Sequence, residues 1–455
     1  MELNIIFEEN KNGIVAILNN KHFSLAYPDG IWKTFPKEIK EALIDNLAHL
    51  LTINIPLIAN AKKIKYNTGR PIFKPLFDEV VRKSLPHAVE DYKIPTGEIL
   101  EQFTEIKYEF SGKPNKKFLK VKKIKAKKES AEKSINMFSF GKDSITSMAV
   151  CDEIGLNSSG VYINDTVSPT ENKLKLSLAK KFPREFGIGI FIVRNEIEQL
   201  NDFDFWDKDE TCVGYTHMVT GFCFISLPFV YDCSARYIVL GNQQGMNFSF
   251  KNKDDFLTYP SFDQTSEWIL KQDQMVKEAT RGQANVMSVI EPLTNISITK
   301  ILHCRYPEFG KYQVSCDCLD ASDEKRWCHE CNKCARNVLF MKAVDIDPKG
   351  VGLRNILADK KNKKLFCLFN GKEIDCYEKS TEARDQQLLA FLMAYENGER
   401  GPLIELFKKN FLEEAKEREG ELRKKFFHIY KSKTMPRKIE KAVTSIYKEE
   451  LSNLV

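Results

Sequence analysis

A six-residue segment, Ser139-Phe140-Gly141-Lys142-Asp143-Ser144, combines residue types that suit phosphate binding. It lies between a short apolar run, 135–138, and a helical pattern over 144–154. Gly141 lets the backbone approach a phosphate closely or adopt a positive φ, and the N-terminus of the next helix directs N–H groups and a positive dipole end at an anion. The segment therefore predicts a phosphate-binding loop. A plain turn followed by a capped helix is the alternative.

The charged pair in this loop indicates what the phosphate chemistry could be. Lys142 offers a mobile positive charge, and Ser139 and Ser144 add hydroxyl donors. Asp143 would repel a bare phosphate, so it acts through Mg²⁺ or caps the helix. The segment lacks the longer glycine-bracketed loop of a Walker A motif.

The loop resembles the Ser-Gly-Gly-x-Asp-Ser signature of the PP-loop, or N-type ATP pyrophosphatase, superfamily and departs from it at Phe140, where glycine is usual. The resemblance implies cleavage of ATP between the α and β phosphates through an adenylylated intermediate. It implies that Lys142 and Asp143 are catalytic and that the whole segment, Ser139, Phe140, Gly141, Lys142, Asp143 and Ser144, contacts ATP.

Two further polar segments follow later apolar runs. Asn164, in Tyr162-Ile163-Asn164-Asp165, could face the adenine or ribose, and Gly241 and Asn242 could line the pyrophosphate or substrate side. An ordinary turn is the alternative for each. The carboxyl ends of parallel strands are where open α/β sheets bind ligands, so we expect both segments near the phosphate loop.

Five of the twelve cysteines fall between Cys316 and Cys334. Cys318, Cys328, Cys331 and Cys334 have the spacing of a tetrahedral zinc site, with Cys316 as an alternative fourth ligand and His329 as a weaker one. An iron–sulfur cluster is the main rival. A closed four-cysteine site has no open coordination position, so we predict a structural role.

The cysteine spacing is similar to the zinc motif of the 7-cyano-7-deazaguanine synthase family, which are PP-loop enzymes that convert a carboxylate into an amide and then a nitrile. Over most of the chain, the sequence looks like the ATP-dependent epimerases of UDP-N-acetylmuramoyl-L-alanyl-L-glutamate. That likeness is carried by 27–36, Asn242, Glu291-Pro292-Leu293 and 327–334. Both families imply a substrate carboxylate that attacks the α phosphorus of ATP, and they imply ATP, Mg²⁺ and Zn²⁺.

Alternating strand and helix patterns must position these residues. Strands are expected at 135–138, 160–163, 189–193 and 237–240, with helices at 144–154, 171–186 and 218–232 between them. This alternation predicts an α/β fold with a doubly wound, mainly parallel sheet of the adenine nucleotide alpha hydrolase-like class.

Three segments differ in pattern. Residues 1–130 predict an N-terminal α+β module, with strands at 4–7 and 13–18, a helix from Pro36 to about Leu51 and a Lys-rich connector. Residues 131–345 predict the PP-loop domain ending in the cysteine site. Residues 346–455 predict a helical C-terminal region, with helices at 383–395 and 403–432.

The composition is that of a globular protein, with 42% hydrophobic and 29% charged residues. No membrane span or secretory signal is expected, so the chain is predicted to be cytoplasmic. The net charge of +6 is modest, but ten lysines and two acids lie between Lys113 and Lys133. That run is typical of a solvated linker. Nucleic acid is a possible but disfavoured partner there, and a tRNA-modifying PP-loop enzyme is a further alternative.

Two other groups of residues are candidates for the site. Cys212, Tyr215 and His217 could supply an epimerase base, although a satisfied histidine at a helix start is the favoured interpretation. Asp263 and Glu267 could bind Mg²⁺ or a substrate amine if both lie on one helical face, and an exposed face is the default. A non-catalytic nucleotide-binding or zinc-stabilised interaction module is the remaining alternative to an enzyme.

Overall fold

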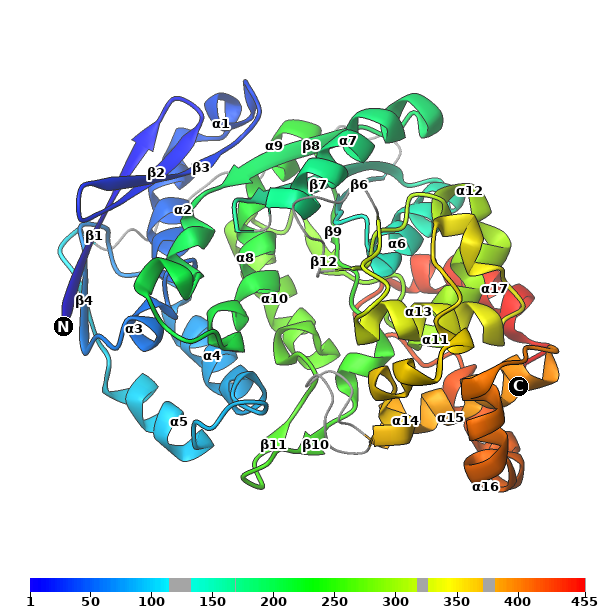
Figure 1. Ribbon diagram of the computed structural model, residues 1–455. Helices are drawn as coiled ribbons and strands as arrows, with labels where there is room; N and C mark the ends of the chain where they lie inside the picture. Colours follow the sequence, from blue (N-terminus) through cyan, green and yellow to red (C-terminus); the bar gives the residue numbers. More distant parts are fainter. Residues whose placement is uncertain (114–131, 168, 317–325, 371–380, 455) are drawn as a thin grey trace.

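The computed structural model describes residues 1–113, 132–167, 169–316, 326–370 and 381–454. The fold is α/β, built on a large, mostly parallel central sheet with helices on both faces (Figure 1). Ten strands form this sheet in the order β12-β9-β6-β7-β8-β3-β2-β1-β4-β5. The Lys113–Lys133 run falls almost entirely outside the described residues.

The segment after residue 131 alternates strands and helices. Its elements are β6 (Lys133–Met137), α6 (Lys142–Glu153), β7 (Asn157–Asp165), α7 (Pro169–Phe186), β8 (Ile190–Asn195), α8 (Met218–Ile225), α9 (Leu227–Cys233), β9 (Tyr237–Val239), α10 (Ser266–Ala279) and β12 (Asn285–Met287), with a small β10 (Phe250–Lys251) and β11 (Leu257–Thr258) hairpin. The predicted alternation is confirmed. The helix expected at 218–232 is divided at Ser226, because Pro228 lies in the first turn of α9 and cannot continue a helical hydrogen-bond ladder.

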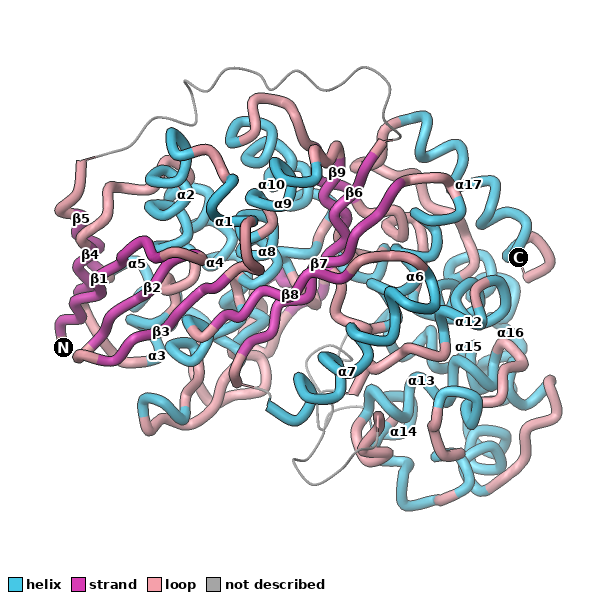
Figure 2. The backbone as a smooth tube through the Cα atoms, turned by 90° about the horizontal axis from the view of Figure 1, so that it is seen from above, coloured by secondary structure: helices cyan, strands magenta, loops and turns pink. Residues whose placement is uncertain are grey.

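The strand order creates a switch point beside the first strand of this segment. β6 lies between β7 and β9, and all five strands from β12 to β8 run parallel. The chain runs from β6 toward β8 with α6 and α7 on one face, and then returns to β9 through α8 and α9 on the other face (Figure 2). Helix α10 follows on that second face and leads to β12. The loops after β6 and β9 therefore open at the position where such sheets bind ligands.

The N-terminal segment extends the same sheet. Its elements are β1 (Glu2–Asn10), β2 (Gly13–Leu18), β3 (Lys21–Ala26), α1 (Ile31–Thr34), α2 (Lys37–Leu50), α3 (Ile55–Ile58), β4 (Lys63–Tyr66), α4 (Lys74–Ala88), α5 (Thr96–Glu105) and β5 (Lys107–Phe110). Strand β3 pairs antiparallel with β8 through Leu25 and Ala26. One hydrophobic cluster joins Leu43 and Phe77 of this segment to Phe224 and Ile238. The segments on either side of residue 130 thus share one sheet and one core.

The C-terminal part is helical. It contains α11 (Asn295–Lys300), a π-helix (Ile301–Arg305), α12 (Pro307–Gly310), α13 (Asn332–Ala343), α14 (Cys367–Asn370), α15 (Thr381–Glu396), α16 (Pro402–Phe426) and α17 (Arg437–Leu451). A second hydrophobic cluster packs α13 and α15 to α17 against Val239 and Met287 at the sheet edge. The helix expected at 403–432 ends at Phe426.

One stretch, Cys212–Cys233, is long and apolar enough to cross a membrane by composition. It comprises a 3-10 turn and two helices, and 78% of its most apolar window is buried inside the protein. That burial is consistent with a core element of a globular protein.

Candidate functional site

The predicted phosphate loop joins β6 to α6 and is held by its own hydroxyl groups. The Ser139 N–H donates to Ser144 Oγ at 3.2 Å, the Gly141 N–H donates to Ser139 Oγ at 3.3 Å, and the Ser144 hydroxyl donates to the Gly141 carbonyl at 3.0 Å. These bonds fold the segment into a compact loop at the N-terminus of α6. The expected strand–loop–helix context is therefore present.

Phe140 takes the strained conformation in the loop. Its φ is +60°, in the left-handed region where glycine is favoured, whereas Gly141 has an ordinary φ of −73°. The Phe140 ring is fully buried, with its centroid 4.7 Å from that of Phe138 and 6.1 Å from that of Phe182. Burial of the ring offsets a backbone strain of roughly 1–3 kcal/mol. The residue that departs from the PP-loop signature thus anchors the loop to the core.

Lys142 and Asp143 form an ion pair at the start of α6. The Lys142 side chain is 9% exposed and that of Asp143 is 35% exposed. Burial lowers the pKa of Lys142 despite the attraction of Asp143, and the positive charge of Arg336 lowers it further. Asp143 therefore faces solvent with room for a ligand, while Lys142 is held close to the helix N-terminus.

A cavity of about 230 Å³ opens on one side of the loop. Its lining is mainly apolar, and the polar residues in it include Asn242 from the β9 end: Met137, Phe138, Ser139, Asp143, Ser144, Val161, Tyr162, Ile163, Val219, Phe222, Leu240, Gly241, Asn242 and Gln264. A Cβ atom at Gly241 would lie 3.3 Å from Asp143 Cβ, so glycine allows β9 to end against α6. Tyr162 and Ile163 reach this cavity, whereas Asn164 is not part of its lining.

A second cavity, of about 290 Å³, lies on the other side of the loop and is rich in cations. Its lining comes from the phosphate loop, from α7, α11 and α13, and from the segments after β9, before α10 and before Cys316: Ser139, Gly141, Lys142, Asp143, Lys175, Gln243, Met246, Gln264, Asn295, Val314, Ser315, Lys333, Arg336, Asn337 and Phe340. Ser139, Asp143 and Gln264 line both cavities. An apolar and a cationic compartment therefore meet at the phosphate loop. The sequence analysis did not predict that Lys333, within the cysteine motif, or Arg336, two residues beyond Cys334, lines this cavity.

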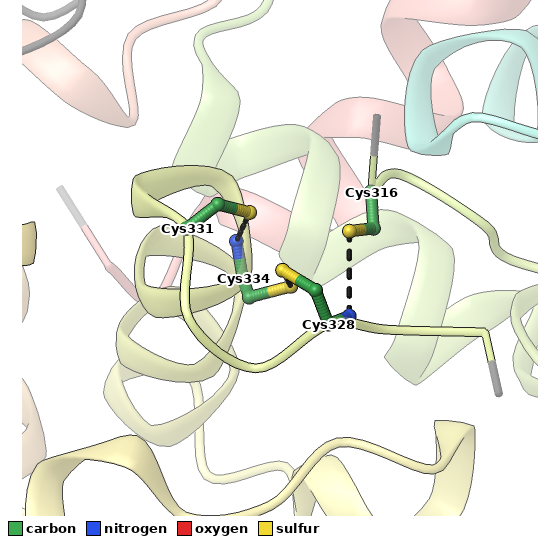
Figure 3. Close-up of side chains that lie close together, drawn as sticks. All are labelled: Cys316, Cys328, Cys331 and Cys334. Atoms are coloured by element: carbon green, nitrogen blue, oxygen red, sulfur yellow. Dashed lines mark hydrogen bonds between the residues drawn. The ribbon is translucent and has the colours of Figure 1, made fainter. Parts of the chain in front are cut away.

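Four thiols gather at the N-terminus of α13 (Figure 3). The sulfur atoms of Cys316, Cys328, Cys331 and Cys334 all lie within 4.8 Å of one another. Cys331 caps α13 by accepting the Cys334 N–H at 3.4 Å, and the Cys328 N–H donates to Cys316 Sγ at 3.4 Å. The predicted alternative ligand, Cys316, thus supplies the fourth thiol in this cluster. Cys318 lies outside the described residues.

The cluster fits a metal ion that prefers sulfur ligands. Hydrogen bonds from Cys316 and Cys334 hold the pKa of Cys331 well below its ordinary value, as expected of a thiol that binds a metal ion as a thiolate. His329, the weaker candidate, accepts the Arg354 N–H through Nδ1 at 3.3 Å, which directs that nitrogen to the backbone. A four-thiolate set suits zinc or an iron–sulfur cluster.

A short segment connects the thiol cluster to the phosphate loop. The Val314 N–H donates to the Phe140 carbonyl at 2.8 Å, and the Lys142 N–H donates to Ser315 Oγ at 3.2 Å. Gln313 donates to Ser315 Oγ at 3.0 Å and to Asn337 Oδ1 at 2.9 Å. Its Oε1 lies 2.8 Å from Nε2 of His303 in the π-helix. Ser315 immediately precedes Cys316, so the two motifs are physically joined.

The remaining candidates do not line either cavity. His217 is fully buried, its pKa is lowered to about 3 by burial, and its Nδ1 lies 2.8 Å from Asn54 Nδ2. Asp263 and Glu267 do not act as a pair: Asp263 is buried and accepts the Val219 N–H at 3.0 Å, while Glu267 bonds Lys83 at 2.9 Å.

Comparisons with known proteins give no family assignment. No protein-family model matches the sequence. No curated protein matches it either.

Proposed function

We propose that this chain is an ATP-dependent enzyme of the PP-loop type, with an adenine nucleotide alpha hydrolase-like fold, that adenylylates a substrate carboxylate. The observation that carries the proposal is the loop 139–144 at the switch point of a mostly parallel sheet, between an apolar and a cationic cavity. The apolar cavity suits an adenine base, which stacks on apolar and aromatic side chains such as Tyr162. The cationic cavity suits phosphates and a carboxylate.

In the proposed reaction, a carboxylate oxygen of the substrate bonds to the α phosphorus of ATP. The bond between that phosphorus and the bridging oxygen breaks, and pyrophosphate leaves with the electron pair. Lys142 and the N–H groups at the start of α6 would stabilise the charge on the departing phosphates. Mg²⁺, when bound, would neutralise further charge, and the half-exposed Asp143 carboxylate is suited to hold it.

The fate of the acyl adenylate distinguishes the candidate enzymes. In an epimerase like those acting on UDP-N-acetylmuramoyl-L-alanyl-L-glutamate, the activated carbonyl makes the adjacent C–H more acidic, and water later releases AMP. In a 7-cyano-7-deazaguanine synthase-like ligase, ammonia displaces AMP. The epimerase is our first proposal because its likeness extends over most of the chain, including Glu291 ahead of the cysteines.

Glu291 has a structural role that suits this likeness. It is 2% exposed and accepts the Ser432 and Thr434 hydroxyl groups at 2.6 and 2.7 Å. It also accepts the Lys433 and Thr434 N–H groups. The carboxylate thereby ties the C-terminal region to the segment between β12 and α11, beside the cationic cavity.

The experiment is a product assay with α-labelled ATP and a panel of UDP-linked peptides, 7-carboxy-7-deazaguanine and tRNA. We expect AMP and pyrophosphate that depend on one carboxylate substrate. We also expect Asp143→Asn to lower the rate by about 100-fold or more. Asp152→Asn, which alters an exposed carboxylate on the same helix, is the control and should leave the rate within about twofold. ADP as the product, or full activity of Asp143→Asn, would contradict the proposal.

A further inference from the structure

Lys175 occupies a position on α7 at which packing alone would favour an apolar residue. The buried residues of this helix recur every three or four positions and so form one row along it: Asn172, Lys175, Leu178, Ala179 and Phe182. Lys175 is 8% exposed, and a lysine is rarely buried to this extent unless its charge has a partner. A lysine in this row therefore needs an explanation other than packing.

The two ends of the row are fixed to parts of the candidate site. Toward the C-terminus of α7, the Phe182 ring packs against the Phe140 ring of the phosphate loop, with 6.1 Å between the two centroids. Toward the N-terminus, Asn172 accepts the hydroxyl group of Tyr162, a residue that lines the apolar cavity. Lys175 lies between these two contacts, so its backbone is held in place relative to both the loop and the apolar cavity.

The Lys175 ammonium group has hydrogen-bond donors that its protein partner does not use. Among the residues that the structure describes, that partner is Glu171, four residues earlier on the same helix. An ammonium group carries three N–H donors, and the hydrogen bond to Glu171 uses one of them. Lys175 lines the cationic cavity together with Gly141 and Lys142, whereas Glu171 lines neither cavity. An anionic ligand in the cationic cavity would supply acceptors for the remaining donors.

We propose that Lys175 is a second cationic contact, in addition to Lys142, for the pyrophosphate that leaves ATP. This inference rests on the proposed function, which identifies the ligand of the cationic cavity as the phosphates of ATP. Negative charge on the pyrophosphate grows as its bond to the α phosphorus breaks. A pre-positioned ammonium group therefore stabilises the transition state more than it stabilises bound ATP.

Glu171 explains how such a cation can be kept buried before the ligand binds. Its carboxylate balances the charge of Lys175, which lowers the free-energy cost of removing that ammonium group from water. Because Glu171 lines neither cavity, it does not place a negative charge against the ligand phosphates. We therefore expect Lys175 to turn its free donors to the pyrophosphate.

The experiment measures binding of pyrophosphate and of AMP to the full, metal-loaded chain by isothermal titration calorimetry in the presence of Mg²⁺. In Lys175→Gln, the dissociation constant of pyrophosphate should rise by about 10-fold or more, because a charge-assisted hydrogen bond is lost. The dissociation constant of AMP should change by less than about threefold, since AMP lacks the β and γ phosphates. In the assay with α-labelled ATP, the same variant should lower kcat by about 100-fold.

Glu171→Gln separates a role in ligand binding from a role in stability, because it breaks the same ion pair and leaves Lys175 in place. This variant should bind pyrophosphate at least as tightly as the unmodified chain, since the ammonium group is no longer shared with a carboxylate. Lys173→Gln is the matched control: Lys173 is exposed on the same helix and lines neither cavity. Its affinity for pyrophosphate should stay within about twofold of that of the unmodified chain.

A further variant covers the case in which Lys175→Gln fails to fold because Glu171 is left unpaired. The double variant with Glu171→Gln and Lys175→Gln removes both charges, and it should show the same loss of pyrophosphate binding. Circular dichroism and metal content should match those of the unmodified chain.

Pyrophosphate binding that is unchanged when Lys175 is replaced would overturn the inference. An equal loss in Lys175→Gln and Glu171→Gln would also overturn it, because the ion pair would then act only as a structural contact. If the unmodified chain binds AMP but not pyrophosphate, the inference fails while the nucleotide site stands. If the unmodified chain binds neither, the proposed function fails and the inference fails with it.

Discussion

The buried, left-handed Phe140 allows a prediction in which glycine and alanine exchange their usual order of stability. Phe140→Gly and Phe140→Ala both remove a ring that is fully buried against Phe138 and Phe182. Removal of such a ring costs roughly 3–5 kcal/mol in the free energy of unfolding. The two variants differ in one methyl group and in their freedom at a φ of +60°.

At most positions, alanine is the more stable residue, by roughly 0.5–1 kcal/mol, because glycine loses more conformational freedom on folding. At Phe140, the left-handed backbone penalises alanine by roughly 1–2 kcal/mol, which glycine avoids. We therefore expect Phe140→Gly to be more stable than Phe140→Ala by about 1 kcal/mol, with both less stable than the unmodified chain.

The assay is urea unfolding followed by fluorescence and circular dichroism, together with binding of a fluorescent ATP analogue. Phe256 provides the control, because it is 39% exposed and its φ is not positive. Replacement of Phe256 should lower the free energy of unfolding by less than about 1 kcal/mol. At this position, the alanine variant should be at least as stable as the glycine variant. A Phe140→Ala variant as stable as Phe140→Gly would refute the reasoning about the loop backbone. A decrease of less than about 1 kcal/mol in the free energy of unfolding of both Phe140 variants would refute the stabilising role of the buried ring.

Three further predictions concern the metal, pH and the connecting segment. The purified chain should hold about one zinc per chain, which Cys316→Ser should reduce while Cys304→Ser should not; stoichiometric iron would contradict the zinc assignment. Burial raises the pKa of Asp263 to about 6. Between about pH 4 and 6, the folded chain therefore keeps a proton on this carboxyl that the unfolded chain has lost. The free energy of unfolding should consequently fall as the pH rises from about 4 to 6. Asp263→Asn should remove about 2 kcal/mol of that fall when unfolding free energies at pH 4 and 6 are compared, and an unchanged difference would contradict burial as the cause. Gln313→Ala should cost about 2 kcal/mol in urea unfolding, because it leaves buried polar partners unpaired, and a neutral effect would argue against the connection between the phosphate loop and α13.

Local pattern was sufficient to predict four neighbouring parallel strands, β6, β7, β8 and β9. The runs 160–163 and 189–193 are apolar throughout, as expected of strands that are covered on both faces. A segment with the apolar spacing of a helix lies between each of these runs and the next. Strand β3 was not predicted, because only Phe23 and Leu25 alternate inward over its six residues. Its pairing with β8 joins residues about 170 positions apart, such as Leu25 and Asn195, and no local pattern carries that information.

The sequence predicted which residues form the loop, but it did not predict the left-handed backbone conformation of Phe140. A glycine at 141 favoured a positive φ there, but the structure assigns that φ to Phe140. The reason is tertiary: the hydrophobic cluster around Phe138, Phe182 and Ile145 stabilises the buried ring more than the left-handed backbone costs. Asn164 was expected from its place at a strand end, but Tyr162 and Ile163 are the residues of that strand that reach the apolar cavity.

The position of Cys316 in the four-thiol cluster depends on contacts outside the cysteine motif. Spacing alone allowed either Cys316 or Cys318, because both are separated from Cys328 by a long loop. The pairing of Val314 with Phe140 and of Ser315 with Lys142 fixes the next residue, Cys316, beside the N-terminus of α13. A thiol of the four-cysteine cluster and a phosphate-loop contact therefore occupy adjacent residues. Loss of the metal should consequently perturb two things together: the start of α6, through Ser315, and the placement of Lys333 and Arg336, through α13.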